Sequence, residues 1–327
     1  MTAPGSAAAT IEAMLAEAGF VAEQVSRSDE RRHFVVVYQY GKVASTSITL
    51  AFCDLEHVLA VQAHFLGRDS VIHELDALLD PDGSDYEQLQ MTGQLVRSIA
   101  ISREIEAFRR GMRRDVQLSI ITPVRHPVDW WRSAIMQDIQ WHLPFLHSIS
   151  RDSVEYRGDD ASAIAIALPI LFERPATMLK SVGGIDSFVD QGLDYDGLYG
   201  WISAAERGAR FHNLVSGFLR PFGWLDEHFS PYLEIRLDEM ETIRPYLLRA
   251  RLGWGTAYLL RYEDVGTAMG VIAEDMGLAD GFVLRRENVS EGRELDGVIR
   301  RSFQSSEIDR LRALSAATSY SRRFGYA

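Results

Sequence analysis

The chain has 327 residues, of which 46% are hydrophobic and 24% are charged, and its formal net charge is −12. This composition is typical of a globular protein, and the negative charge excludes a broad cationic surface for nucleic acid or an anionic membrane. Cys53 is the only cysteine, which excludes an intrachain disulfide and argues against a cysteine-based metal site. We therefore expect a cytoplasmic protein that does not bind nucleic acid.

The N-terminal segment, residues 1–30, is expected to form an amphipathic helix followed by a polar connection. Glu12 and Glu17 lie among its apolar residues and no basic residue precedes them, which differs from the pattern of a signal peptide. The longest apolar stretch, residues 161–172, has about half of the roughly 20 residues that a membrane-spanning helix needs. We expect no membrane span.

Short apolar runs rich in β-branched residues predict strands, with helical stretches between them. The strands are expected at residues 34–38, 57–65, 116–121, 232–237 and 257–262. This alternation predicts an α/β fold with a mostly parallel sheet of about five strands flanked by helices. Residues 137–230 have no strand pattern and are expected to form a helical insertion on the acceptor side of a single domain, residues 1–327.

The turn after the first predicted strand has the residues of a phosphate cradle. Gly41 permits a tight turn and Lys42 supplies a positive charge. Three hydroxyl residues open the helix that follows: Ser45, Thr46 and Ser47. In the magnesium-dependent ATP-binding loop a Ser or Thr directly follows the lysine, whereas Val43 follows Lys42 here. The turn therefore predicts an anion site of a different type.

A second motif follows the predicted strand 116–121. Arg125 comes at the carboxyl edge of the sheet, where open α/β folds bind ligands, and Pro127 suits the first turn of a helix. Arg125 and Ser133 can together clamp a phosphate, and no aspartate stands at the strand end to hold a metal. Taken alone, the first motif also fits an ordinary strand-to-helix turn, and Arg125 of the second also fits a surface salt bridge. The pair predicts a ligand with two separate phosphate groups.

Together the motifs resemble those of the sulfotransferases that use 3′-phosphoadenosine 5′-phosphosulfate (PAPS). The family pattern Tyr-x-Lys-x-Gly-[Ser/Thr]-Thr is similar to residues 40–46, and Arg-[Asp]-Pro-x(5)-Ser is similar to residues 125–133. Ala44 stands where the family mostly has glycine, and His126 stands where it has an acidic residue. Further resemblance to the bacterial capsular-polysaccharide-synthesis branch lies in residues 37–48, 260–265 and 320–326.

The resemblance implies a P-loop fold and PAPS as the co-substrate, with no metal. Lys42 and the hydroxyls of the first turn would hold the 5′-phosphosulfate, and Arg125 with Ser133 would hold the 3′-phosphate. A late basic segment completes the second phosphate site in related enzymes, although paired arginines also occur on solvated faces. The residues implied in nucleotide binding are Gly41, Lys42, Val43, Ala44, Ser45, Thr46, Ser47, Arg125, Ser133, Arg285 and Arg286.

His64, at the end of the second predicted strand, is the candidate base. Sulfuryl transfer to a hydroxyl needs a base within hydrogen-bond reach, and a histidine at a similar position performs this role in the 2-O-sulfotransferase-like branch. Alternatively, His64 is a structural residue bonded to a backbone carbonyl, and an acidic residue elsewhere in the chain is the base. The segment Arg261-Tyr262-Glu263-Asp264 is expected to form a structural strand-to-helix junction. Core packing is expected for Trp130, Trp131, Trp141 and Trp224.

These patterns predict a sulfotransferase that moves a sulfuryl group from PAPS to a hydroxyl of a carbohydrate, glycolipid or small metabolite, with Lys42 and His64 as catalytic residues. One alternative is a magnesium-dependent nucleotide kinase or NTPase on a P-loop scaffold. Another is a non-catalytic protein of this fold that binds a glycan or a protein partner. The acceptor and the oligomeric state are left open.

Overall fold

The structure is a computed structural model that describes residues 32–68, 85–181, 183–185, 214–215, 217–285 and 295–326. The expected N-terminal helix, residues 1–30, lies outside these ranges. The chain forms two compact units, each of which is described by itself. We call Met1–Val124 with Trp224–Glu287 the sheet unit, and Arg125–Gly223 with Asn288–Ala327 the helical unit.

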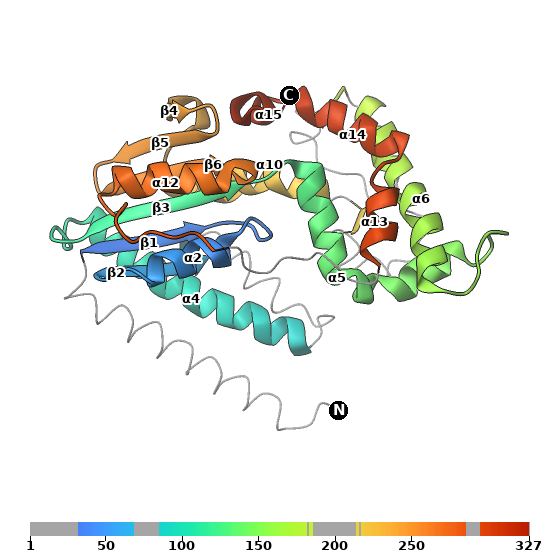
Figure 1. The fold of residues 1–327 in the computed structure, drawn as a ribbon, viewed down its shortest axis with the longest axis horizontal. Helices are drawn as coiled ribbons and strands as arrows, with labels where there is room; N and C mark the ends of the chain where they lie inside the picture. The colour runs from blue at the N-terminus through green and yellow to red at the C-terminus, as the bar shows by residue number, and fades with distance from the viewer. Residues whose placement is uncertain are drawn as a thin grey trace. The chain divides into compact units, whose positions relative to one another are not determined.

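The sheet unit contains one sheet of six strands in the order β2-β1-β3-β6-β5-β4 (Figure 1). The strands are β1 (His33–Tyr38), β2 (Val58–Ala63), β3 (Gln117–Val124), β4 (Glu241–Arg244), β5 (Leu247–Leu252) and β6 (Gly255–Arg261). The pairs β1–β2, β1–β3 and β3–β6 are parallel, and the pairs β4–β5 and β5–β6 are antiparallel. The predicted α/β fold with a mostly parallel sheet is confirmed.

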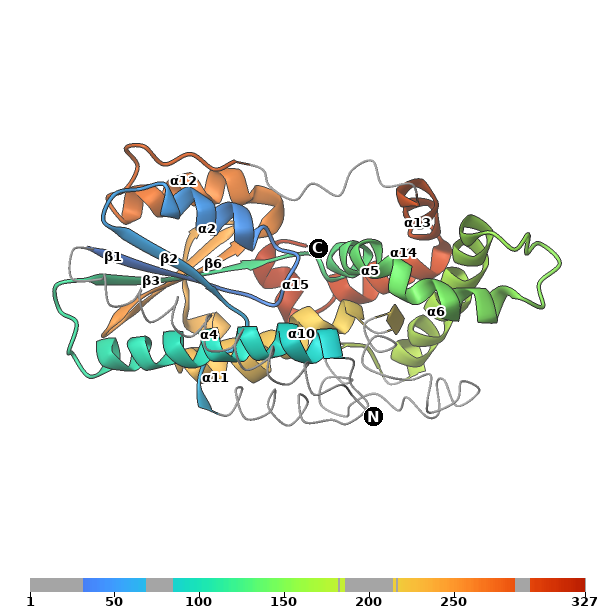
Figure 2. The same ribbon diagram turned by 90° about the horizontal axis from the view of Figure 1, so that it is seen from below.

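Helices cover both faces of this sheet, with α2 and α12 on one face and α4 and α11 on the other (Figure 2). The helices of the sheet unit are α2 (Ser45–Cys53), α4 (Asp85–Arg109), α11 (Ser230–Leu233) and α12 (Val265–Asp275), with π-helix η4 (Leu225–Phe229) and 3-10 helices η5 (Leu237–Glu239) and η6 (Tyr262–Asp264). Ile48 and Phe52 of α2 and Met269 of α12 join strand residues in one buried apolar core. Burial on both faces explains the continuous Val-rich sequence of β1.

The helical unit has no strand among its described residues, as expected for 137–230. Its elements are α5 (Pro127–Ser150), α6 (Asp160–Ser181), η3 (Gly217–Leu219), α13 (Asp296–Ser302), α14 (Ser306–Ala316) and α15 (Ser319–Phe324), while α10 (Arg220–Trp224) spans the boundary between the units. Trp131 of α5 is fully buried, and its ring contacts the rings of Phe172, Phe218 and Phe303. In the described part of the chain, none of the helices combines the length and apolar character that crossing a bilayer requires.

The prediction of a strand at 232–237 is wrong. Pro231 lies in the first turn of α11, a position that proline favours, and Glu234 then ends this helix with φ 56°. The chain turns there instead of extending. Two antiparallel strands, β4 and β5, were not predicted, because arginines interrupt the apolar pattern of β5. Arg249 pairs there with Glu241 at 2.8 Å and with Asp275 at 2.6 Å.

Candidate functional site

The topology of the sheet places the first predicted turn at an edge where open α/β sheets commonly bind ligands. β1 lies between β2 and β3, so the chain leaves β1 toward one side of the sheet and leaves β3 toward the other. Open α/β sheets bind ligands beyond the carboxyl ends of strands at such a point. The turn of residues 39–44 joins the carboxyl end of β1 to α2.

This turn contains a cluster of left-handed backbone conformations. Gly41 has φ 94°, Lys42 has φ 57° and Ala44 has φ 61°. Tyr40, just before them, is 3% exposed and Val43, among them, is fully buried, so these two side chains anchor the turn in the core. Left-handed residues in a turn bring successive N–H groups together into a concave anion site, and for a non-glycine residue each costs roughly 1–2 kcal/mol. The backbone is therefore held in a costly conformation at Lys42 and Ala44.

The start of α2 receives no help from a side-chain cap. Ala44 is the N-cap residue and its methyl group accepts no hydrogen bond. The first N–H groups of a helix have no partner within the helix and carry a partial positive charge. Ser45 and Ser47 are buried and Thr46 is half-buried in this first turn. The predicted loop therefore has the form of an anion-binding helix start.

Gln39, which the sequence interpretation missed, links the turn to His64. Its side chain is 1% exposed, and its Oε1 atom accepts a hydrogen bond from the N–H of Gly41. This contact fixes the amide orientation, so that Nε2 faces the His64 ring, 3.4 Å from its Nε2 atom and 3.5 Å from its Nδ1 atom. The sequence signal that could have drawn attention to Gln39 is a polar residue directly after the five apolar residues of the strand, Phe34–Tyr38.

The backbone of His64 is held separately from its ring. Trp224 donates from Nε1 to the carbonyl oxygen of His64 at 3.3 Å, and its ring lies 5.4 Å from that of Tyr40. Trp224 is only 4% exposed, as expected for a packing role. Trp130 and Trp131 are also buried, whereas Trp141 is 55% exposed, so the expected structural role holds for the other three.

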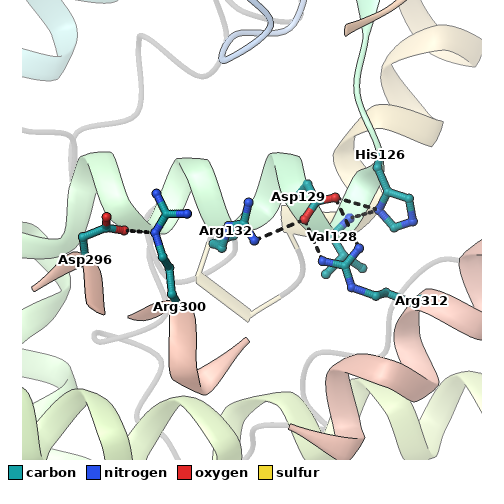
Figure 3. Close-up of polar contacts among 7 residues, drawn as sticks. All are labelled: His126, Val128, Asp129, Arg132, Asp296, Arg300 and Arg312. Carbon is teal, nitrogen blue, oxygen red and sulfur yellow. Dashed lines mark hydrogen bonds and ion pairs between the residues drawn. The ribbon is translucent and has the colours of Figure 1, made fainter. Parts of the chain in front are cut away.

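The second motif opens α5 in the helical unit. His126 is the N-cap residue, and its Nδ1 accepts a hydrogen bond from the N–H of Val128 at 3.2 Å. The pKa of His126 is lowered to about 4, chiefly by burial and also by the charge of nearby Arg312, while Asp129 opposes the shift (Figure 3). The ring is therefore neutral at pH 7 and accepts at Nδ1. His126 thus performs the capping role that aspartate commonly has.

Arg125 and Ser133 both lie at the beginning of this helix. Arg125 immediately precedes the N-cap residue and Ser133 lies in the second turn, and both side chains are half-buried. The carbonyl oxygen of Arg125 accepts from the hydroxyl of Tyr320 at 3.3 Å. The two residues predicted to hold the 3′-phosphate thus both lie in the helical unit, near the start of one helix. Lys42 and His64 belong to the sheet unit.

Arg285, one of the two late basic residues predicted to complete the 3′-phosphate site, lies near the C-terminal end of α2. Arg285 is 74% exposed and lies 4.0 Å from Asp54, which is the C-cap of α2 and so at the opposite end of this helix from Lys42. Arg286 lies outside the described residues. Arg261 donates to Asp264 at the junction of β6 and α12, in agreement with the expected structural role.

The described ranges contain no group of three or more His, Cys, Asp or Glu side chains that could hold a metal ion. The chain matches no protein-family model, no curated protein and no solved structure. The functional assignment therefore depends on the motifs and on the geometry of each unit.

Proposed function

We propose that this chain is a PAPS-dependent sulfotransferase that acts on a hydroxyl of a carbohydrate, glycolipid or small metabolite. The observation that carries the proposal is the turn between β1 and α2, where three left-handed residues lead into a helix start without a side-chain cap. A strained turn of this kind suits the binding of a phosphate group by backbone N–H groups. The resemblance to the sulfotransferase motifs then favours PAPS over other phosphorylated ligands.

The two phosphate groups would be bound by different motifs. The 5′-phosphosulfate would contact the N–H groups and hydroxyls of Ser45 and Thr46 together with the ammonium group of Lys42. The 3′-phosphate would receive charge-assisted hydrogen bonds from Arg125 and a hydrogen bond from Ser133. The capping bond of His126 supports this assignment, because it preserves the helix start in the absence of the acidic residue of the family motif.

In the proposed reaction the acceptor hydroxyl attacks the sulfur in line with the bond to the 5′-phosphate. A new oxygen–sulfur bond forms, the bond between sulfur and the phosphate oxygen breaks, and 3′,5′-ADP leaves with the electron pair. Lys42 and the N–H groups of the turn stabilise the negative charge that develops on the leaving oxygen. Positioning of the two substrates supplies much of the remaining rate enhancement.

His64 would take the proton of the acceptor hydroxyl. The Gln39 amide donates toward the ring, and a ring nitrogen that accepts this bond must carry a lone pair. The contact distances of 3.4 and 3.5 Å are at the long end for a hydrogen bond. In the reaction, the acceptor hydroxyl would replace the Gln39 amide as the hydrogen-bond donor to a ring nitrogen of His64.

The proposal is tested by the thermal stability of the protein with 3′,5′-ADP or with ATP and magnesium. A ligand that binds only the folded state raises the melting temperature. At a concentration of 100 Kd it increases the free energy of unfolding by about 2.7 kcal/mol. We expect 3′,5′-ADP to stabilise the wild type and Lys180→Ala but not Lys42→Ala. Lys180 is the matched control because it is the only other lysine and is exposed on α6.

Each other outcome contradicts the proposal in a defined way. Stabilisation by ATP and magnesium, but not by 3′,5′-ADP, would favour a nucleotide kinase or NTPase. The absence of any response to both ligands would favour a non-catalytic protein. Normal sulfate transfer by His64→Ala would remove His64 as the base and leave the nucleotide assignment unchanged.

A further inference from the structure

Hydroxyl groups are buried beneath the face of the sheet that α4 and α11 cover (Figure 2). Tyr38 is the last residue of β1, Tyr232 lies in α11, and Ser98 lies in α4. The side-chain oxygens of these three residues are shielded from solvent, and among the described residues no protein group meets them in hydrogen-bond geometry. A buried hydroxyl without a partner is costly, so each such group needs a physical explanation.

The phenol rings of Tyr38 and Tyr232 lie against each other, with centroids 6.1 Å apart and ring planes at 72°. Tyr38 is fully buried, and the rings of Trp224 and Phe229 also pack on it. Burial, together with the neighbouring Tyr232, raises the pKa of Tyr38 well above its usual range. Burial also raises the pKa of Tyr232 to about 12. Both phenols are therefore neutral at pH 7, and each has a proton to donate.

The segment that follows β2 brings further polar groups to these phenols. The N–H of Gly67 donates to Oγ of Ser102 at 3.1 Å, and a Cβ atom on Gly67 would lie 2.7 Å from the Tyr232 ring. The N–H of Leu66 opposes the rise in the pKa of Tyr38, and the hydroxyl of Ser102 opposes that in Tyr232. Each of these groups is thus near a phenol oxygen without making a well-formed hydrogen bond to it. The two phenols face polar groups that they do not reach directly.

We propose that Tyr38 and Tyr232 together bind one internal water molecule, which joins β1, α11 and the segment after β2. A buried water typically makes about three hydrogen bonds to polar groups that otherwise lack partners. This water would accept from the two phenol hydroxyls and donate to Oγ of Ser102. Ser98 lies one turn before Ser102 on the same side of α4 and offers a further hydroxyl.

This inference does not depend on the sulfotransferase proposal, because it uses none of the residues assigned to PAPS or to the acceptor. Leu66 and Gly67 follow His64 closely in the chain, so the water would hold the segment that leads away from the candidate base. The two proposals can fail separately. The tests with 3′,5′-ADP measure nucleotide binding, whereas the test of this site counts water molecules.

The experiment counts the long-lived internal water molecules of the full-length protein by magnetic relaxation dispersion of the water oxygen nuclei. We expect Tyr38→Phe and Tyr232→Phe each to lose one such water. The double variant should lose the same single water and no more. Tyr258→Phe is the matched control in the same unit, because the Tyr258 hydroxyl donates directly to Asp275 at 2.6 Å, and it should keep the count of the wild type.

Urea unfolding provides a second readout, because the sign of its change depends on the water. Loss of a hydroxyl that is bonded to a water should lower the urea midpoint, whereas loss of a hydroxyl with no partner should leave the midpoint unchanged or raise it. We expect both single variants to lower it, and the double variant to lower it by less than their sum, since the phenols share one water.

Three results would overturn the proposal. An unchanged water count in either single variant would show that its hydroxyl binds no long-lived water. A urea midpoint that rises in Tyr38→Phe would show that the Tyr38 hydroxyl is an unpartnered group whose removal stabilises the fold. Loss of two waters in the double variant would show that the phenols occupy separate sites.

Discussion

Ala44 provides a quantitative test of the turn, because the structure places an unsuitable residue type at the start of α2. Its backbone has φ 61° and ψ 21°, in the left-handed region, and its side chain does not cap the helix. For a residue with a Cβ atom, this conformation costs roughly 1–2 kcal/mol relative to the right-handed one. Glycine adopts it without this cost and is also a better N-cap residue than alanine.

The Ala44→Gly substitution should therefore increase the free energy of unfolding. Relief of the left-handed conformation contributes roughly 1–2 kcal/mol, and the greater freedom of glycine in the unfolded chain removes roughly 0.4–1 kcal/mol. The expected net gain is about 0.5–1 kcal/mol. Urea unfolding followed by circular dichroism, with unchanged dependence on urea concentration, measures this gain.

Ala100→Gly is the matched control for this substitution. Ala100 is a half-buried residue within α4, in the same unit, where glycine costs about 1 kcal/mol relative to alanine. The two Ala→Gly changes should therefore have opposite signs. If Ala44→Gly destabilises the protein as Ala100→Gly does, then Ala44 is not left-handed, and the conformation on which the anion site depends is refuted.

Three further changes test other parts of the account. His126→Asn keeps a capping side chain but removes a group whose pKa is about 4 when folded and 6.5 ordinarily. As the pH falls, the unfolded chain takes up this proton before the folded protein does. The free energy of unfolding of the wild type should therefore fall by about 2 kcal/mol more than that of the variant between pH 7.5 and pH 5. Parallel pH profiles of the two proteins in urea unfolding would contradict the neutral His126 cap. Gln39→Leu leaves the Gly41 N–H without its acceptor and should cost about 1–3 kcal/mol, with faster hydrogen exchange at Gly41; unchanged exchange would show that this bond does not hold the turn. Arg312→Gln breaks the two bonds to Asp129 and should cost about 1 kcal/mol, whereas Arg310→Gln should change stability by less than about 0.5 kcal/mol; equal unfolding free energies for the two variants would contradict the role of Arg312 in joining α14 to α5.

The sheet unit was largely predictable where its sequence is locally consistent. The apolar run of β1 and the β-branched residues of β3 have few alternatives to a buried strand. The segment 232–237 has alternating apolar residues as well, but Pro231 and the left-handed Glu234 favour a short helix and a turn. β5 escaped prediction because its arginines interrupt the apolar pattern, and the acidic partners of Arg249 lie on other elements, Glu241 on β4 and Asp275 on α12.

The candidate site was predictable only in part. The residue types at Gly41 and Lys42 indicated a tight turn, but the sequence could not show that Ala44 is left-handed too, since alanine rarely adopts that conformation. Gln39 became visible as a bridge to His64 only through the pairing of β1 with β2, which sets Tyr38 opposite Ala63. The capping role of His126 similarly depends on the neutral ring that burial produces.

The most direct test of the central claim is the affinity of the protein for 3′,5′-ADP compared with that for 5′-AMP, measured by calorimetry. If Arg125 and Ser133 hold a 3′-phosphate, its charge-assisted bonds should make 3′,5′-ADP bind at least about tenfold more tightly than 5′-AMP. Arg125→Gln should remove most of this difference. Equal affinities for the two nucleotides in the wild type would contradict the assignment of a PAPS site.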